Sequence, residues 1–574
     1  MEATALDRLP AGSNLEMSKE ELKPMLNLIQ NNHGSALVVA LLMLIMLSFI
    51  GIASISTSVR DMDIAKNTTD RTDAFYVAEA GLEMAFGILK NNASVLANDS
   101  LMALMSPYTT MPNGSFNLAI QGTMLGTTPY KTITSMGTAS EGQAAVQSQF
   151  KRKKNALNIW NNVMFAGSGQ QGRGIQGNVA YHGPIHILGD GEDFTDQNGN
   201  GNWDDADQFT DSNGNGVWNP GEPLTLDTDG DGVWDPAEPY WDDNGNGMYD
   251  GTLTATDLAF DISGTAGQYN NYSGMPVTIS SRIPALDQDY FNGEIVYTLE
   301  ADMRVKHGTV NLSGNAKIGE PNQSGGSPAV KETVDGTYVN DGWGGNMGTA
   351  NVYSDNGYSE AYDLGDELSF PSIHDSYTDP STGTTYADYI SWIQAHALVI
   401  SGDVTLTNGT AYAGSSNSYG SISMDNKGNL NISGIVMFTG NVTFDGKKGN
   451  ILYDGRGTIV SGGNMYINAN VLSKGQFPTD DVMGFFSTHD LEIATGNGAS
   501  QLDMMGAMFA QNKIVNAKQN NLAGAMVSNF FSVTNVPHMY FVPSIVDNLP
   551  PGMPGGGTIY KYTYKKVQGS WREL

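Results

Sequence analysis

The sequence predicts a mainly β protein that begins with one long α-helix. Three observations predict this class: an uncharged apolar run at 36–55 that continues as a helical pattern, many short apolar segments between Gly and Asn turns, and an acidic stretch with a repeated spacing. The chain has 574 residues, of which 69 are Gly and only 16% are charged. Such a length allows about two to four structural units, and the composition favours turn-rich β structure over a helical enzyme.

The charge of the chain excludes some partners, and its lack of Cys excludes some kinds of site. The formal net charge is −31, so we expect no nucleic-acid partner, because phosphate binding needs a cationic surface. The segment from Asp190 to Asp250 alone contains 17 Asp or Glu and no Lys or Arg. A segment of this kind either stays solvated or is neutralised by cations. The chain has no Cys, which excludes disulfides and zinc–thiolate sites.

The N-terminal helix is predicted to start in a membrane. Residues Ala36 to Ile55 form an uncharged run of about 20 residues, the length needed to cross a hydrocarbon core of about 30 Å. The preceding residues, 1–34, are mostly polar and contain both Lys and Glu, so they do not have the pattern of a secretory signal peptide. Beyond the run, Ser56 to Leu89 contains no Pro and repeats apolar residues at steps of three and four. We therefore expect one continuous helix that leaves the bilayer as a stalk.

Two motifs around this helix resemble a known family. Gly34-Ser-Ala-Leu-Val-Val39 begins the apolar run, and Ala74-Phe-Tyr-Val-Ala-Glu-Ala-Gly81-Leu follows it. With these motifs, residues 30 to 95 resemble the N-terminus of PilX-type minor pilins and are similar to the K-type minor pseudopilins of type II secretion. The resemblance implies a leader peptide at 1–34, cleavage by a prepilin peptidase between Gly34 and Ser35, and a transmembrane and stalk helix at 35–95.

One residue departs from the common pilin pattern. Most pilins carry Glu as the fifth mature residue, where it pairs with the terminal amine of a neighbouring subunit, whereas this chain has Val39. An unpaired carboxylate inside the bilayer costs about 2.5–3.5 kcal/mol on insertion scales, so a subunit without a neighbour above it is better without one. The PilX-type and K-type families share this loss. The resemblance therefore implies a minor or tip position.

Residues 96–155 are predicted to form a small antiparallel sheet on the stalk, as in a pilin head. Three segments alternate between apolar and polar residues and are separated by turns, namely Ser115–Ile120, Tyr130–Thr134 and Gln143–Phe150. The basic run Lys151–Lys154 follows the last of them. We expect this run to be the solvated end of a strand and not a binding patch.

Four acidic segments within 190–255 share one spacing. They begin at Asp196, Asp211, Asp227 and Asp242, which are 15, 16 and 15 residues apart. Each has Asp or Asn at positions 1, 3 and 5, Gly at position 6 and an aromatic residue at position 8, which is the spacing of a calcium loop. In such a loop, position 7 offers a backbone carbonyl and position 12 a bidentate carboxylate. The candidate metal ligands are Asp196, Asn198, Asn200, Asn202, Asp204 and Asp207; Asp211, Asn213, Asn215, Val217, Asn219 and Glu222; Asp227, Asp229, Asp231, Val233, Asp235 and Glu238; and Asp242, Asn244, Asn246, Met248 and Asp250.

Calcium is the predicted cofactor of these loops, because a hard cation that takes about six to eight oxygen ligands fits this donor set. The fourth loop has Leu253 at position 12, so we expect it to bind more weakly or to use a neighbouring carboxylate such as Asp257. Pro residues between the loops disfavour the helices of an EF-hand, and the layout resembles the thrombospondin type 3 repeats of extracellular proteins. The alternative interpretation is a disordered acidic linker.

Residues 156–189 and 256–574 are predicted to form one β-rich body that the acidic insert at 190–255 interrupts. From Gly434 onward, segments that combine Gly with apolar residues step forward by roughly 18 to 27 residues. Irregular repeats of this length favour a β-helix-like body in which successive coils stack. A β-sandwich is the alternative, because its strands are also short.

These features together predict a minor subunit of a type IV pilus or of a type II secretion-like pseudopilus, stabilised by calcium and with an adhesive role. The expected partners are other pilin subunits, prepilin peptidase and the membrane, and a tip adhesin or a surface glycan for adhesion. We expect a single-pass location in the bacterial inner membrane before assembly and a cell-surface filament afterwards. No catalytic signature follows residue 255, so we predict no enzyme. The alternatives are a surface-anchored adhesin outside any filament and a polysaccharide-active β-helix enzyme.

Overall fold

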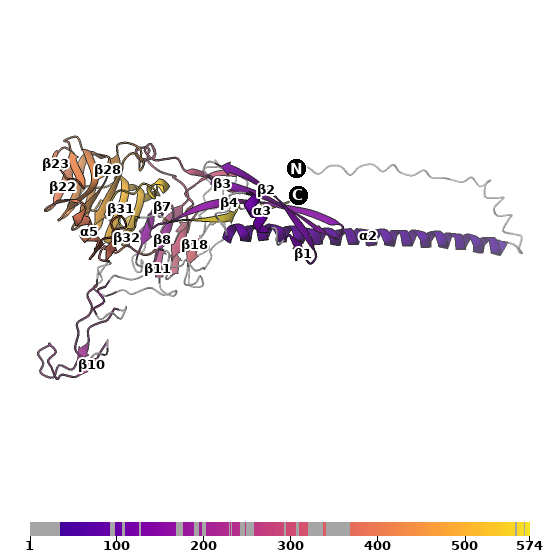
Figure 1. The fold of residues 1–574 in the computed structure, drawn as a ribbon, viewed down its shortest axis with the longest axis horizontal. Helices are drawn as coiled ribbons and strands as arrows, with labels where there is room; N and C mark the ends of the chain where they lie inside the picture. Colours follow the sequence, from indigo (N-terminus) through magenta and orange to yellow (C-terminus); the bar gives the residue numbers. More distant parts are fainter. Residues whose placement is uncertain are drawn as a thin grey trace.

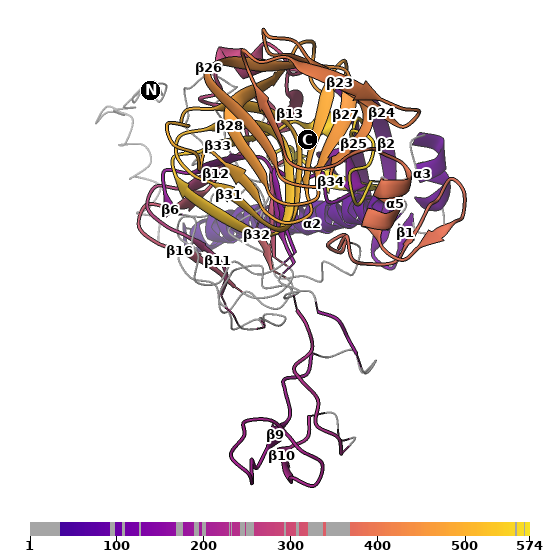
Figure 2. The same cartoon turned by 90° about the vertical axis from the view of Figure 1, so that its left-hand side faces the viewer.

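A computed structural model of the chain shows a rod, a head, a body and a side arm (Figures 1 and 2). The rod is the first half of helix α2 (Ser35–Asn91), and the head is the sheet packed on its second half. The body is a large stack of strands beyond the head, and the arm, residues 194–249, projects to the side. The structure describes residues 35–574 except 92–97, 106–108, 126–127, 168–175, 189–193, 198–202, 229, 231, 241–246, 248, 250–257, 292–293, 306–308, 320–336, 340–367, 557–558 and 568.

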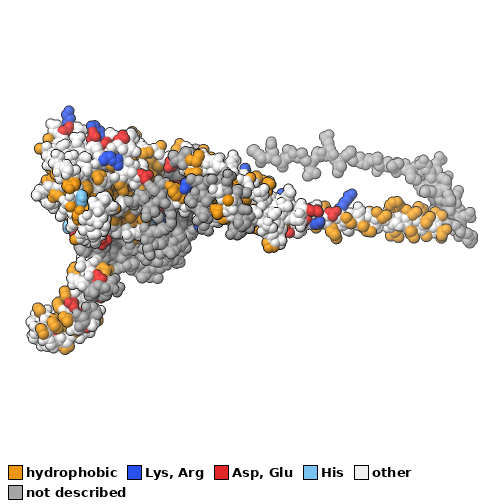
Figure 3. Space-filling model, in the orientation of Figure 1, with side chains coloured by type: hydrophobic (Ala, Val, Ile, Leu, Met, Phe, Trp, Pro, Cys, Tyr) orange, Lys and Arg blue, Asp and Glu red, His pale blue; other side chains and the backbone are white. Residues whose placement is uncertain are grey.

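The rod is apolar and exposed along its first half. Helix α2 is continuous, as predicted, and none of the residues in its apolar stretch is buried. Figure 3 shows hydrophobic side chains along this half and charged side chains nearer the head. The hydroxyls of Ser48 and Thr57 donate to the carbonyl oxygens of Leu44 (2.7 Å) and Ala53 (3.0 Å), so neither hydroxyl needs water. By length and composition, this helix can cross a membrane.

The head is a six-stranded antiparallel sheet. The three strand segments predicted from sequence fall within β2, β3 and β4, and the small antiparallel sheet is confirmed. A short helix, α3 (Asn98–Met105), packs beside α2. The strands of the head are β1 (Thr110–Met111), β2 (Gly114–Leu125), β3 (Thr128–Ala139), β4 (Gly142–Leu157), β34 (Ile559–Lys566) and β35 (Arg572–Glu573).

Small residues bring the second half of α2 close to the sheet. Ala74 and Ala78 are completely buried on the helix, and Gly137 on β3 faces their backbone. A Cβ added at Gly137 would lie only 2.5 Å from the amide nitrogen of Ala78. The side chains of Leu82 and Phe150 are also fully buried in the same core. The helix and the sheet are therefore in backbone contact.

The end of the chain joins the head. Strand β34 pairs antiparallel with β4, from Ile559 opposite Leu157 to Lys566 opposite Phe150. The prediction that the body extends to residue 574 is therefore wrong, because β34 and β35 belong to the head sheet. The pairing covers the free edge of β4 with a strand that is distant in sequence, and such a pairing leaves no local periodic signal.

The body is a stack of mainly parallel strands. Residues in successive strands lie directly opposite one another and form a buried column. The strand-rich body expected from sequence is confirmed, and its mainly parallel pairing differs from the antiparallel pairing of a β-sandwich. The column runs through Val436, Ile459, Phe485, Met508, Met526, Met164, Ile185 and Met303.

The strands of the body form one 21-stranded sheet, and several shorter elements lie beside it or on the arm. The sheet contains β5 (Met164–Ala166), β6 (Gln176–Gly177), β7 (Ala180–His182), β8 (Ile185–Ile187), β12 (Gly267–Tyr269), β15 (Met303–Val305), β17 (Lys317–Ile318), β18 (Thr337–Val339), β21 (Leu398–Ile400), β22 (Val404–Thr407), β23 (Tyr412–Ser416), β24 (Gly420–Met424), β25 (Asn429–Phe438), β26 (Val442–Asp454), β27 (Arg456–Ser461), β28 (Met465–Ser473), β29 (Val482–Ser487), β30 (Leu491–Ile493), β31 (Asp503–Asn516), β32 (Asn521–Asn535) and β33 (His538–Phe541). The other elements are β9 (Gln208–Phe209), β10 (Leu224–Leu226), β11 (Leu258–Ile262), β13 (Asp287–Phe291), β14 (Glu294–Thr298), β16 (Thr309–Leu312), β19 (Tyr377–Thr378), β20 (Thr385–Tyr386), α4 (Val277–Ser280), α5 (Tyr389–Ala395) and the 3₁₀ helix η4 (Pro543–Ile545).

The order of strands in the stack does not follow the sequence. Strand β32 pairs with β5, and β33 pairs with β7, so the last strands of the body lie next to its first ones. The chain therefore enters and leaves the body in the middle of the stack. The indole nitrogen of Trp160, on the entering segment, donates to the carbonyl oxygen of Pro554, on the leaving segment (2.8 Å). Two chain segments thus connect the body to the head.

We expect Gly137→Ala to loosen the contact between helix and sheet. The new methyl group would overlap the backbone of α2, and overpacking of this kind costs about 1–3 kcal/mol. Hydrogen exchange of β3 in the detergent-solubilised full chain should become faster. Gly122→Ala on β2 is the matched control, because nothing lies within 4 Å of a Cβ at that position. Equal exchange rates in the two variants would contradict the close packing.

Candidate functional site

The predicted metal loops lie on the arm. The chain leaves the body after β8 and returns at β11, and β9 and β10 lie near the far end of the arm (Figure 2). Ten of the candidate ligands lie outside the described residues: Asn198, Asn200, Asn202, Asp229, Asp231, Asp242, Asn244, Asn246, Met248 and Asp250. Gly34 of the predicted cleavage site also lies outside them, whereas Ser35 is the first residue of α2.

The second loop is described completely and has the predicted form. The Asp211 carboxylate accepts hydrogen bonds from the backbone N–H groups of Gly214 (2.6 Å) and Gly216 (2.7 Å), so the loop wraps around position 1. The Glu222 carboxylate accepts from the N–H groups of Ser212 (2.9 Å) and Asn219 (2.8 Å), which closes the loop from position 12. Both Gly residues have positive φ angles, +73° and +74°, which residues with a side chain rarely adopt.

The carboxylates of this loop are held in their charged form. Hydrogen bonds from the backbone, that of Gly216 first, lower the pKa of Asp211 below its ordinary value. Burial opposes the charge of Glu222, but hydrogen bonds from Asn219 and Ser212 outweigh it and lower the pKa of Glu222. Both groups are therefore anionic at neutral pH. They lose this stabilising charge only when the pH falls through their lowered pKa values.

The first and third loops exchange their closing residues. The carboxylate of Glu238 accepts from the N–H groups of Gln197 (2.6 Å) and Asp204 (3.1 Å), both of the first loop. The carboxylate of Asp207 accepts from the N–H groups of Thr228 (2.8 Å) and Asp235 (3.0 Å), both of the third loop. The prediction from spacing that Asp207 closes the first loop and Glu238 the third is therefore wrong. Spacing alone cannot show which of two neighbouring loops a position-12 residue approaches.

The exchange is reinforced by the backbone and by the position-8 aromatic residues. The N–H of Asp207 donates to the carbonyl of Asp235, and the N–H of Glu238 donates to the carbonyl of Asp204, each at 3.0 Å. The indoles of Trp203 and Trp234 donate to the carbonyls of Glu238 and Asp207, respectively, each at 2.8 Å. In the second loop the indole of Trp218 makes the same bond within its own loop, to Glu222 (3.1 Å). The four aromatic residues at position 8 are half-buried.

The described part of the array has the donor chemistry of a calcium site. The second loop offers oxygen donors alone, from the backbone carbonyl of position 7 and from the side chains of Asp211, Asn213, Asn215, Asn219 and Glu222. No nitrogen or sulfur ligand is needed. The side chain of Val217 at position 7 has no ligand atom, so only its backbone carbonyl can serve the loop. Among the described residues, no three His, Asp or Glu side chains gather into one metal cluster.

A second cluster of charged residues joins the head to the body. Lys151 and Lys153 on β4 are both 8% exposed, and Lys151 forms ion pairs with Asp289 and Glu300. Lys153 lies 3.4 Å from Glu300, and the hydroxyl of Tyr130 donates to Asp289 (2.5 Å). The prediction that the run Lys151–Lys154 is a solvated strand end is therefore wrong. Alternation along β4 places Lys151 and Lys153 on one face, and the acids that cover them come from a distant part of the sequence.

Burial and charge act in opposite directions on this cluster. Burial opposes the charge of Lys151, but Glu300 and Asp289 outweigh it and raise the pKa of Lys151 above its ordinary value. Burial, together with the nearby charge of Asp289, also raises the pKa of Tyr130. Tyr130 and Tyr290 meet edge to face, with ring centroids 5.3 Å apart. The hairpin β13–β14 is thus fixed to the head by ion pairs and by an aromatic contact.

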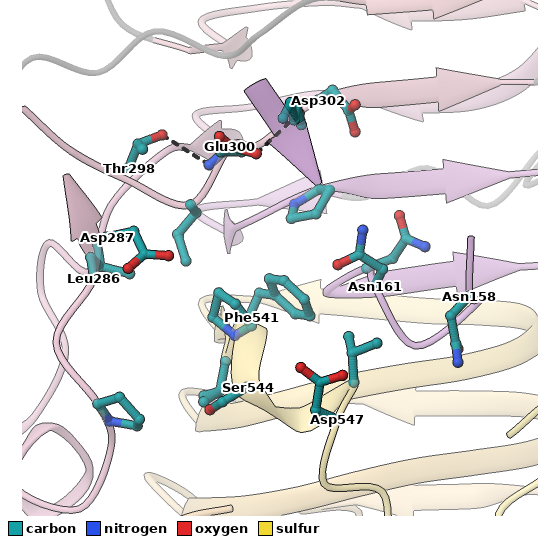
Figure 4. Close-up of a pocket in the computed structure, with 18 of the residues that line it drawn as sticks. Asn158, Asn161, Leu286, Asp287, Thr298, Glu300, Asp302, Phe541, Ser544 and Asp547 are labelled. Carbon is teal, nitrogen blue, oxygen red and sulfur yellow. Dashed lines mark hydrogen bonds and ion pairs between the residues drawn. The ribbon is translucent and has the colours of Figure 1, made fainter. Parts of the chain in front are cut away.

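A cavity of about 590 Å³ lies beside this junction (Figure 4). Residues of the head, such as Arg152, and residues of the body, such as Asn161 and Asp547, line it together. Several of its charged groups pair with one another: Arg304 lies 3.1 Å from Asp302, and Lys153 lies 3.4 Å from Glu300. The cavity therefore belongs to the contact between head and body.

The N-terminal part of the chain matches a known family. Residues 33–83 match the PilX N-terminal family, and this range contains the start of α2 and the motif that ends at Gly81–Leu82. No protein of curated function matches the chain. Among solved structures, the competence-associated pilin ComZ from Thermus thermophilus is similar, with 17% sequence identity and a TM-score of 0.41, over 87% of this chain and 98% of that chain.

The residues that match the family form most of the long helix, and the antiparallel sheet of the head packs on the second half of that helix. Within residues 33–83 the chain is of the PilX type, and the resemblance inferred from sequence is confirmed. The match supports a minor pilin related to type IV pili.

We expect Lys151→Ala to weaken the junction between head and body. The substitution would leave Asp289 without its buried cation and Glu300 with Lys153 alone, and losing one partner of a buried pair costs about 3–5 kcal/mol. Hydrogen exchange of β13 and β14 in the full chain should report this loss as easier local opening.

Lys474→Ala is the control for this experiment. Lys474 pairs with Asp454 at 2.7 Å, but both side chains are about half exposed, and pairs of this kind contribute about 0–1 kcal/mol. If both substitutions have an equally small effect on hydrogen exchange of the strands around them, the Lys151 cluster does not hold the junction.

Proposed function

We propose that this chain is a minor subunit, located at the tip, of a type IV pilus or of a type II secretion-like pseudopilus. The observation that carries the proposal is that one helix has two different surroundings. Its first half is apolar and exposed, while its second half is buried against the head. The first half must find an apolar environment, which is the bilayer before assembly and a bundle of sister helices in a filament.

The tip position is supported by Val39. This residue replaces the Glu that most pilins use to pair with the amine of a neighbouring subunit. It lies on α2 with 49% of its surface exposed. A subunit with no neighbour above it has no partner for such a carboxylate, and an uncharged residue removes the cost of burying it. The processing enzyme in this proposal is a prepilin peptidase that cuts between Gly34 and Ser35.

The arm is proposed to bind calcium. The support is the oxygen-only donor set of the second loop, its lowered carboxylate pKa values and the repeated spacing of the loops. Calcium would neutralise a segment with 17 acidic residues and no basic ones between Asp190 and Asp250. Outside the cell, sites that bind at about 10⁻⁴–10⁻³ M are filled, so we propose a stabilising role and not a sensor role.

An adhesive role is proposed for the body and the arm. Both lie beyond the head and away from the rod, so a filament would present them outward (Figure 1). The exposed side chains of Tyr419 on the body and of Val217 and Leu226 on the arm offer apolar contact area. A surface glycan or a tip adhesin is the proposed partner.

We expect the mature protein to begin at Ser35. Mass spectrometry of the N-terminus of the protein purified from cells with a prepilin peptidase should show loss of residues 1–34. The variant Gly34→Leu should keep the leader. An intact leader in the unaltered chain would contradict assembly by pilin machinery and would favour a tethered surface protein.

We expect removal of divalent cations to expose residues 190–255 to a calcium-independent protease. Without cations, the like charges of the arm repel one another and the arm opens. The stacked strands of the body should stay resistant, because their core is apolar. Adding calcium in excess of the chelator should restore resistance, and unchanged cleavage after chelation would contradict the metal proposal.

A further inference from the structure

We propose that the first and third loops bind calcium as one coupled pair, while the second loop binds independently. This inference rests on the proposed calcium function and deepens it. In the pair, Asp207 completes the third loop and Glu238 completes the first, although spacing along the chain assigns them the other way. Each loop therefore depends on the other for its position-12 carboxylate.

The two exchanged carboxylates are the best-buried acids of the described arm. Asp207 is 4% exposed and Glu238 is 5% exposed, whereas Asp211 of the second loop is exposed. A buried carboxylate needs hydrogen bonds, and each of these receives two from the N–H groups of the opposite loop. Opening one loop would leave the carboxylate from the other without these bonds. The two loops must then open together.

The exchanged positions of Asp207 and Glu238 also hold the base of the arm closed. Phe194 forms an antiparallel bridge with Tyr240, and the N–H of Thr195 donates to the carbonyl of Pro239 (2.8 Å). These contacts lie directly beside the first loop and beside Glu238. Calcium in the coupled pair would therefore hold the two chain segments at the base together. The second loop lies between β9 and β10 and has its own closing residue, so it can fill without affecting the base.

The test is calcium titration of the detergent-solubilised full chain, followed by hydrogen exchange of peptides from each loop. In the unaltered chain, residues 196–204 and 227–235 should gain protection at the same calcium concentration, and 211–219 at its own. Asp207→Asn should raise the concentration that protects 227–235 by about tenfold or more, because the third loop loses one carboxylate ligand, and 196–204 should shift with it because the two loops open together. Glu238→Gln should do the same for 196–204, and 227–235 should shift with it. Glu222→Gln is the matched control and should affect 211–219 alone.

Two outcomes would overturn the inference. In the first, Asp207→Asn acts on 196–204 and leaves 227–235 unchanged, which means that each loop closes itself. In the second, the first and third loops of the unaltered chain become protected from hydrogen exchange at clearly different calcium concentrations. If no loop gains protection from calcium in the unaltered chain, the proposed calcium function fails as well. Exchange in β27–β31 of the body serves to show that each variant is folded.

Discussion

The apolar first half of α2 is the constraint on which the rest of the molecule depends. Its side chains are exposed in the isolated chain, and exposed apolar surface of this length is stable only in a bilayer or against other helices. The second half of the same helix is already satisfied, because Ala74 and Ala78 lie in backbone contact with Gly137 of the head. The position of the anchored rod therefore fixes the position of the head and of everything attached to the head.

The body is coupled to this rod more firmly than a linker would allow. Two chain segments cross between head and body, and the bond from Trp160 to Pro554 holds them side by side. Lys151 adds a buried ionic contact from β4 to Asp289 and Glu300. Buried ion pairs are poor sources of net stability, but they penalise every arrangement in which one partner is left alone. They therefore define one orientation of the body on the head.

The arm solves a different physical problem, because it has little apolar core. Its order depends on carboxylates that accept backbone hydrogen bonds and on indoles that donate to the carbonyls of position 12. The exchange of Asp207 and Glu238 ties the two ends of the arm to each other, whereas Glu222 serves only its own loop. This division gives the arm a clamped base and an independent tip.

The sequence by itself determined the elements whose signal is local: the continuous helix, the three head strands with their alternating pattern, and the spacing of Asp211 to Glu222. Only the tertiary structure decided which distant segments meet. Periodicity reports which face of a strand is buried, but it does not report the partner that buries it, and so β34 on β4, β5 beside β32 and the burial of Lys151 could not be predicted. The same reason applies to Asp207 and Glu238, because two loops of identical pattern offer each carboxylate equivalent N–H groups. The path of the chain in space chooses between them.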